Sequence, residues 1–199
     1  MPNYCYQQMY CYGTAEDIAT LKQHILNEDK QGEIHFDFNR VIAMPAELNI
    51  ACVSPVGSAL QKAYAQNKQK YGYETWYDWC IANWGTKWNA MNTQILDSPA
   101  DLCIAFDTAW NPAIPIYQQL FKAFPQLQFK IDYLEVGAGL AGSCYSEQGE
   151  LVEDLFTGNI DEFAWSHFGW DLVNESFDHD EGDNAEGNEL SVENEEDVR

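Results

Sequence analysis

Two periodicities alternate along the chain, and their order constrains the fold more strongly than any other feature of the sequence. Apolar residues recur at every second position in residues 4–12, 102–106 and 129–133, which is the period of a strand with one face against a core. Residues 15–27 and 112–124 instead repeat at three and four positions, the period of an amphipathic helix. This order predicts helices packed on one face of a mostly antiparallel sheet.

The first predicted strand presents a different kind of side chain on each face. The two sets are Cys5, Met9 and Cys11 on one side, and Tyr4, Tyr6, Tyr10 and Tyr12 on the other. Thr14 then caps a helix, with Asp17 three residues later as in a capping box. A second strand is predicted for residues 34–38, with the side chains of Ile34 and Phe38 on the same face.

The strongest helical segment is residues 74–84, which is rich in tryptophan. One face of this helix carries, at helical spacing, Trp76, Trp79, Cys80, Asn83 and Trp84. Gly85 follows at the position where helices often end in a left-handed conformation, and a strand is predicted to start around Lys87. Residues 57–70 predict a weaker helix, so we expect a helical insertion at about residues 55–85.

A ferredoxin-like α+β sandwich is the simplest architecture for this order of elements, and we expect residues 1–173 to form it as a single domain. The run from Trp76 to Trp88, W-Y-D-W-C-I-A-N-W-G-T-K-W, resembles the hallmark of the YubB ferredoxin-like domain family of phage and plasmid proteins. Three further stretches fit the resemblance: Asn3 to Gly13, Phe38-Asn39 followed by Met44-Pro45, and Phe106 to Trp110 leading to Pro112 and Pro115. The resemblance covers roughly residues 2–150. It implies a ferredoxin-like fold and a mobile-element origin, but no established chemistry.

The charge is strongly negative. Thirty-two acidic residues against ten basic ones give a formal net charge of −22. Residues 174–199 hold eleven acids and one base, a net of −10, and residues 1–173 hold 21 acids and nine bases, a net of −12. We expect the C-terminal stretch to be a disordered acidic tail. A surface of this sign repels phosphate backbones and anionic membranes, which disfavours direct binding of nucleic acid or lipid.

Targeting signals and metal motifs are not evident. The longest apolar runs fall short of the ~20 residues of a membrane span, and the N-terminus lacks the pattern of a secretory signal. We therefore expect an intracellular protein, and the resemblance to phage and plasmid proteins implies the cytoplasm of a bacterial host. The six cysteines have no C-x-x-C spacing and the four histidines stand singly, so we expect neither a metal nor a cofactor.

Catalytic groups do not form a recognisable set. No serine lies in a G-x-S-x-G motif, and His35 near Asp37 is interpreted as a surface histidine. Four acids suited to metal-assisted chemistry fall on different predicted elements, with no spacing that joins them: Asp37, Asp107, Asp132 and Glu135. Gly137 and the glycines after it lie between two predicted strands, where a hairpin is favoured over a phosphate loop. No catalytic residue is assigned, and the chain is predicted not to be an enzyme.

The leading functional hypothesis rests on the acidic body. Carboxylates at roughly phosphate spacing would compete for the basic groove of a nucleic-acid-binding protein. Together with the mobile-element resemblance, this predicts a non-enzymatic inhibitor of a host defence complex of the restriction or CRISPR type, acting by DNA mimicry. The predicted partner-binding acids are Glu16, Asp17, Glu147, Glu150, Glu153, Asp154, Asp161 and Glu162. Acidity that only keeps the protein soluble is the simpler alternative.

Two other functions are left open by the sequence. The first is a pocket for a small ligand such as a nucleotide, used by an enzyme or a sensor and formed by Trp84, Lys87, Trp88, Asp107, Trp110 and Glu135. Against it, a tryptophan stripe at helical spacing is usually core. The second is an RNA-binding sheet that stacks bases on the tyrosines of residues 4–12. Lys22 and Lys30 are the only basic residues near that stretch, which weakens the RNA interpretation. The oligomeric state is left undetermined by the sequence.

Overall fold

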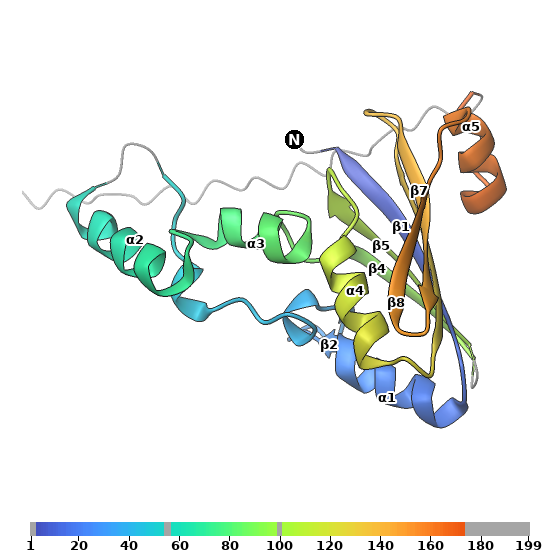
Figure 1. Cartoon of the computed structure of the whole chain (residues 1–199), viewed down its shortest axis with the longest axis horizontal. Helices are drawn as coiled ribbons and strands as arrows, with labels where there is room; N and C mark the ends of the chain where they lie inside the picture. Colours follow the sequence, from blue (N-terminus) through green and yellow to red (C-terminus); the bar gives the residue numbers. More distant parts are fainter. Residues whose placement is uncertain (1–2, 54–56, 99–100, 174–199) are drawn as a thin grey trace, which may run out of the picture.

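A six-stranded antiparallel sheet organises the part of the chain that the computed structural model describes, residues 3–53, 57–98 and 101–173. In spatial order its strands are β4 (Met91–Asp97), β5 (Asp101–Ala109), β1 (Tyr4–Tyr12), β6 (Gln128–Glu135), β7 (Leu140–Glu147) and β8 (Glu150–Leu155). Helices α1 (Ala15–Ile25) and α4 (Ile114–Ala123) cover one face of this sheet, and α5 (Ile160–Phe163) lies on the other (Figure 1).

The connectivity is that of a ferredoxin-like sandwich, so the predicted α+β fold is confirmed. In chain order the main elements run β1–α1–β4–β5–α4–β6, and the corresponding strands lie side by side as β4-β5-β1-β6. The hairpin of β7 and β8 then extends the sheet beyond β6 and makes β8 an edge strand. We call the face opposite α1 and α4 the outer face.

The alternation of β1 is as predicted. Cys5, Met9 and Cys11 are fully buried under α1 and α4, whereas the tyrosines of β1 point to the outer face and are at most partly covered. Thr14 caps the helix as predicted, because its Oγ1 accepts a hydrogen bond from the Asp17 backbone N at 3.2 Å. Helix α1 ends at Ile25, two residues earlier than predicted, since Leu26 is extended and starts β2.

The prediction for residues 34–38 is wrong in two respects. Strand β3 (Ile34–Phe36) ends early, because the Asp37 side chain accepts a hydrogen bond from the Asn39 backbone N and starts the turn η1 (Phe38–Arg40). Its partner is β2 (Leu26–Glu28), in a small sheet separate from the main one. Phe38 is therefore buried as part of a turn, and Ile34 is 49% exposed.

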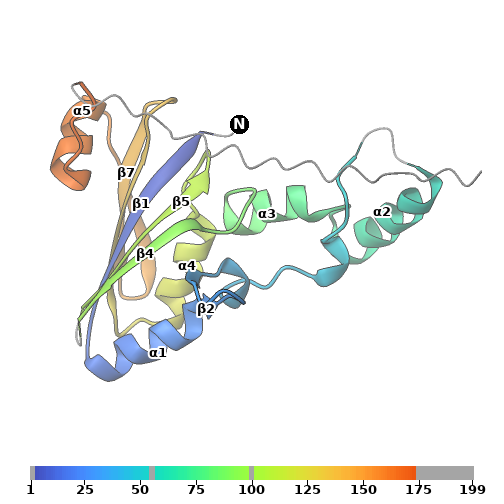
Figure 2. The same cartoon turned by 180° about the vertical axis from the view of Figure 1, so that it is seen from behind.

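The predicted helical insertion contains two helices with different surroundings. Helix α2 (Ser58–Tyr71) extends away from the sheet (Figures 1 and 2). Asn67 ties it to the preceding turn η2 (Ala46–Leu48) by donating from Nδ2 to the Glu47 carbonyl at 2.9 Å. Helix α3 (Trp76–Trp84) instead packs three side chains into the main core, namely Trp79, Cys80 and Trp84.

The end of α3 agrees with the sequence, but the following strand starts later than predicted. Gly85 ends the helix in the left-handed region, at φ +82°. Strand β4 then begins at Met91 rather than near Lys87. Asn89 holds the intervening segment by accepting from the Phe38 backbone N at 2.8 Å and donating to Asp37 Oδ1 at 2.7 Å. The predicted tail, residues 174–199, lies outside the described residues.

A second, smaller core lies on the outer face. It is built where α5 and the π-helical turn η3 (Ala164–Phe168) pack on β6 and β7, and its fully buried members are Leu134, Ala141, Phe163 and Ala164. Partly buried aromatic residues from the C-terminal segment, including Phe156 and Trp170, surround it. In the described part of the chain, no helix is both long and apolar enough to cross a membrane.

Candidate binding site

A cavity of about 320 Å³ lies between the β7–β8 hairpin and the C-terminal helical turns. Strands β7 and β8 form one side, and α5 with η3 forms the other. The residues that line it are Ser143, Tyr145, Asp154, Leu155, Phe156, Thr157, Gly158, Phe163 and His167. The hairpin supplies these side chains to the outer face because Ser143 pairs with Asp154, and Tyr145 with Val152, across the two strands.

A buried carboxylate supports this cavity from β6. Asp132 is 1% exposed. Its Oδ2 lies 2.8 Å from Lys130 Nζ and 3.2 Å from His167 Nδ1, and its Oδ1 accepts a hydrogen bond from Ser143 Oγ at 2.5 Å. Burial of a carboxylate requires such compensation by donors and positive charge. Asp132 thus joins β6, β7 and η3 at one point.

The environment of His167 restricts the orientation of its ring. Its Nδ1 lies 3.2 Å from Asp132 Oδ2, and the tautomer that carries its hydrogen on this Nδ1 has Nε2 as an acceptor. The ring also stacks on Phe163, with centroids 4.0 Å apart and planes at 14°. Two neighbours therefore fix the orientation of the imidazole, a carboxylate at one ring edge and a phenyl ring against one face.

The cavity is lined mainly by hydrogen-bond acceptors and apolar groups. Asp154 contributes a carboxylate, and the Ser143 hydroxyl is left to accept because its hydrogen is directed to Asp132. Phe156 and Phe163 add aromatic rings whose centroids are 5.0 Å apart. None of the nine lining residues is a lysine or an arginine. An arrangement of this kind can bind a group that carries several donors.

Six of the acids predicted to bind a partner lie along this side of the molecule. We call them the acidic edge: Glu147, Glu150, Glu153, Asp154, Asp161 and Glu162. By register Glu147, Glu150 and Asp154 belong to the outer face, and Lys122 Nζ approaches Glu150 at 4.0 Å. Glu153 is on the other face of the hairpin, where it accepts a hydrogen bond from the Tyr133 hydroxyl at 2.7 Å.

The remaining two predicted partner-binding acids lie apart from the acidic edge. Glu16 and Asp17 occupy the first turn of α1, on the opposite face of the sheet. Asp17 is already engaged locally, because Thr14 Oγ1 donates to it at 2.6 Å and Gln126 Nε2 donates to it at 3.0 Å. These two hydrogen bonds lower the pKa of the Asp17 carboxyl. The structure therefore brings six of the eight acids together and leaves two elsewhere.

The alternative pocket around the tryptophan motif is not assembled by the structure. Trp84 is a core residue whose Nε1 donates to the Ile42 carbonyl at 2.9 Å. Lys87 Nζ lies 4.0 Å from the ring centroid of its neighbour Trp88. Asp107 accepts from Asn92 Nδ2 at 2.8 Å on the outer face, the side of the sheet opposite Trp84.

The other two members of that alternative pocket also have separate environments. Glu135 is buried, and its carboxylate accepts hydrogen bonds from the backbone N of Gly137 at 2.9 Å and of Ala138 at 2.7 Å. It stabilises the turn between β6 and β7. Trp110 is 44% exposed at a left-handed backbone position, φ +73°. With Trp84 in the core and Asp107 on the outer face, these six residues do not converge on one point.

The tyrosines of β1 are partly occupied by neighbours. Trp170 packs edge-on against Tyr6 at a centroid distance of 4.7 Å, and the Tyr10 hydroxyl donates to Gln8 Oε1 at 2.7 Å. Tyr12, at the end of the strand, is 45% exposed. Stacking of RNA bases on Tyr6 would require Trp170 to move, so the C-terminal segment covers part of the proposed RNA platform.

His35 pairs with Asp29 rather than with Asp37. Its Nε2 lies 3.1 Å from Asp29 Oδ2 in the β2–β3 hairpin, and the same carboxylate also accepts from the backbone N of Glu33. Asp29, Glu33 and His35 bring three ligand-type atoms within 4.8 Å of one another. These hydrogen bonds lower the pKa of Asp29, and they account for the cluster as a stabilised hairpin turn.

Sequence reasoning missed the group around Asp132. Part of the signal was present, because Lys130 and Asp132 alternate with Phe129 and Ile131 and so must share the face opposite the core. A charged pair inside a sheet predicts a covering partner. Nothing in the periodicity of residues 151–172 identified His167 as that partner.

Comparisons with known proteins agree with the architecture. A family model described as "Ferredoxin-like domain in Api92-like protein" matches residues 83–186, slightly more than half of the chain. The crystal structure of protein api92 from Yersinia pseudotuberculosis is similar, with a TM-score of 0.51 and 11% identity, over 80% of this chain and 99% of that one. At this identity the likeness concerns the fold alone. A search of curated proteins found no match.

Proposed function

The chain belongs to the family of ferredoxin-like domains in Api92-like proteins, and on that premise we propose that it acts by binding rather than by catalysis. Its partner is a host defence protein with a basic nucleic-acid-binding surface, of the restriction or CRISPR type. The partner's DNA groove is occupied by carboxylates of this chain, and its activity is inhibited. We further propose an origin in a mobile genetic element, as the YubB resemblance implies, and action in the cytoplasm of the bacterial host.

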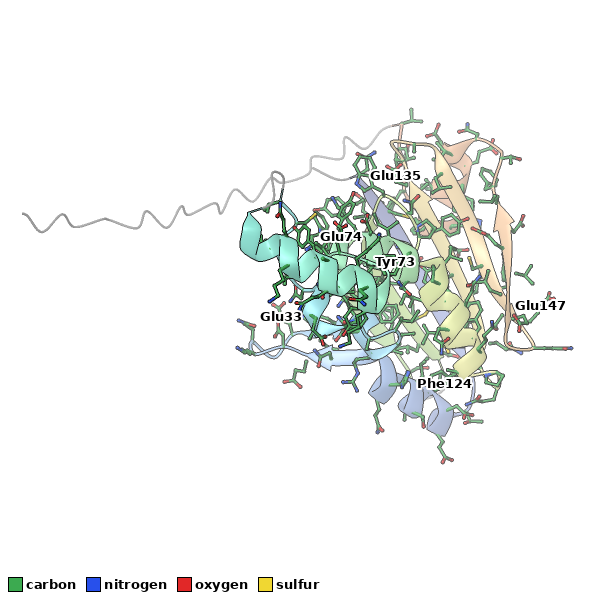
Figure 3. The ribbon with its side chains drawn as sticks, turned by 60° about the vertical axis from the view of Figure 1, so that its left-hand side comes forward. Glu33, Tyr73, Glu74, Phe124, Glu135 and Glu147 are labelled. Atoms are coloured by element: carbon green, nitrogen blue, oxygen red, sulfur yellow. The ribbon has the colours of Figure 1, made fainter. Side chains whose placement is uncertain are left out.

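The observation that supports this proposal is the acidic edge. Four of its carboxylates come from one hairpin, and two more lie in the first turn of the adjacent α5. All except Asp161, which is half-buried, belong to exposed residues. Glu147 lies on the opposite side of the molecule from Glu33 and Glu74 (Figure 3). The carboxylates of the edge are thus concentrated on one hairpin and its neighbouring helix.

The physical reason for inhibition is competition between two polyanions. DNA binds basic grooves through phosphates, and displacement of its counterions makes that binding steeply dependent on salt. A row of carboxylates on a rigid hairpin offers negative charge to the same groove and steers the two proteins together. Binding of this kind weakens as salt rises, and it is reversed by an excess of DNA.

The experiment is a DNA-cleavage assay with a panel of purified restriction and CRISPR effector complexes. With at least one of them, the chain should inhibit cleavage at about 50 mM salt and lose most of that inhibition at about 500 mM. Excess non-cleavable DNA should displace the chain from the effector, because the two compete for the same groove. Inhibition that is equal at both salt concentrations would exclude an electrostatic DNA mimic.

A further inference from the structure

We propose that the cavity between the β7–β8 hairpin and the C-terminal helical turns binds an arginine side chain of the basic partner. The inference deepens the proposed function and rests on it for the identity of the partner. The cavity lies on the acidic edge, since Asp154 belongs to both. The edge supplies general attraction, and the cavity supplies one specific anchor for the bound protein.

The hydrogen-bonding character of the lining selects a group with donors only. The Asp154 carboxylate has no hydrogen to donate. Ser143 Oγ directs its hydrogen to Asp132, which leaves the Ser143 oxygen as an acceptor. His167 Nε2 is a second acceptor in the tautomer whose Nδ1 hydrogen faces the same carboxylate. A guanidinium carries five N–H donors and no acceptor. It therefore matches this lining better than an amide, a hydroxyl or a phosphate.

Charge and shape lead to the same ligand. An anion would meet Asp154 with no lysine or arginine in the lining to compensate it. The partly buried ring of Phe156 contributes aromatic surface, on which a planar guanidinium stacks more readily than a hydrated ammonium. The volume of about 320 Å³ is at the small end of ligand pockets, which suits one side chain.

The position of Asp132 explains why the cavity keeps this character. It is buried beneath the site and holds three neighbours: Lys130, Ser143 and His167. Lys130 Nζ is bonded to Asp132 at 2.8 Å, so its positive charge is compensated there. Asp132 is thus a positioning residue for the acceptors, and Asp154 is the carboxylate that meets the ligand.

The test uses the full chain labelled with ¹⁵N and titrated with N-acetyl-arginine methylamide. Saturable shifts are expected at the amides of Ser143, Tyr145 and Gly158. N-acetyl-citrulline methylamide, a neutral ligand of the same shape, should give none. Asp154→Asn should raise the dissociation constant for the arginine compound about tenfold. The matched control, Glu147→Gln, removes one charge of the acidic edge outside the cavity and should change it less than about twofold.

The outcomes separate this inference from the proposed function. Saturable arginine binding that Asp154→Asn weakens about tenfold supports the anchor, even where no effector complex is inhibited and the proposed function fails. Inhibition that persists while arginine produces no shifts, or while Asp154→Asn and Glu147→Gln weaken it equally, overturns the anchor and leaves the edge as the binding surface. Equal shifts with N-acetyl-lysine methylamide would also overturn the assignment of a guanidinium.

Discussion

His167 Nδ1 lies 3.2 Å from Asp132 Oδ2, and this contact fastens the C-terminal helical turns to the middle of strand β6. The carboxylate is almost completely buried and is shared with Lys130 and Ser143. One polar group thereby joins the C-terminal turn η3 to two consecutive strands, β6 and β7. Without it, the cavity would lose the group that fixes His167 and Ser143 in place.

The first prediction concerns the stability of this junction. Asp132→Ala leaves the Ser143 hydroxyl and the Lys130 ammonium without their partner, and it should lower the free energy of unfolding by about 1–3 kcal/mol. The control is Glu162→Ala, at an exposed position in the first turn of α5. It should change the free energy of unfolding by no more than about 0.5 kcal/mol. Urea unfolding followed by tryptophan fluorescence gives both values. Similar losses for the two variants would contradict the structural role of Asp132.

The tryptophan motif provides the second prediction. Trp84 is buried against Phe38 and Trp79, so Trp84→Ala should lower the free energy of unfolding by about 3–5 kcal/mol. Lys87 lies over the ring of its neighbour Trp88. Lys87→Ala should therefore lower the free energy of unfolding by about 1 kcal/mol or less. Thermal unfolding measures both. A small effect at Trp84, accompanied by loss of a bound nucleotide on Lys87→Ala, would restore the pocket alternative.

Cysteine reactivity gives the third prediction. Burial raises the pKa of Cys11 and Cys144 to about 12 and that of Cys80 to about 11. These thiols stay protonated and covered at neutral pH, whereas Cys52 is exposed. Iodoacetamide should therefore modify Cys52 first in the native protein, as mass spectrometry can show. All six should react in denaturant, and native labelling of Cys144 as fast as Cys52 would contradict the core.

The fourth prediction concerns the ion pair that joins α2 to η2. Hydrogen bonds from Lys70, at 2.9 Å, and from its own backbone and Tyr71 lower the pKa of Glu47 to about 2. The folded-state pKa is depressed, so this stabilisation is present above the ordinary glutamate pKa and is lost as pH falls toward 2. The contribution is small because both side chains are more than half exposed, at 63% for Lys70 and 55% for Glu47.

A carboxyl titration by NMR checks the direction of this shift. Lys70→Met should return the Glu47 pKa toward its ordinary value. Lys68→Met, which removes the same charge from the same helix, should leave the Glu47 pKa low. A Glu47 pKa that is unaffected by Lys70→Met would show that this hydrogen bond is absent in solution.

The parts of the fold that depend on periodicity could be predicted, because alternation directly encodes which side chains share a face. The strand of residues 4–12 and the helix ending at Gly85 are examples. The predicted strand over residues 34–38 is too long, because the Asp37 side chain accepts a hydrogen bond from the Asn39 backbone N and ends the strand. Local competition between a side chain and the sheet does not alter the apolar pattern.

The candidate site depends on relationships that periodicity does not contain. Asp132 and Ser143 meet through the register of the β6–β7 hairpin, and His167 reaches them only through the docking of η3. Predicting them would have required the order of the strands in the sheet. The acids of the β7–β8 hairpin, in contrast, are close in sequence, and the structure places them on one edge.

The central claim is that the acidic edge, rather than the overall negative charge, binds the basic partner. Its most direct test compares two variants of equal net charge. The edge variant changes Glu147, Glu150 and Glu162 to Gln and Asp154 to Asn, and the control variant changes the exposed Glu28, Glu33 and Glu74 to Gln and Asp78 to Asn.

The measurement is the concentration of each variant that inhibits DNA cleavage by half, with the effector complex that the unmodified chain inhibits. The edge variant should need at least about tenfold more protein, and the control variant should stay within about threefold of the unmodified chain. Equal losses for the two variants would contradict the account, because inhibition would then follow net charge alone.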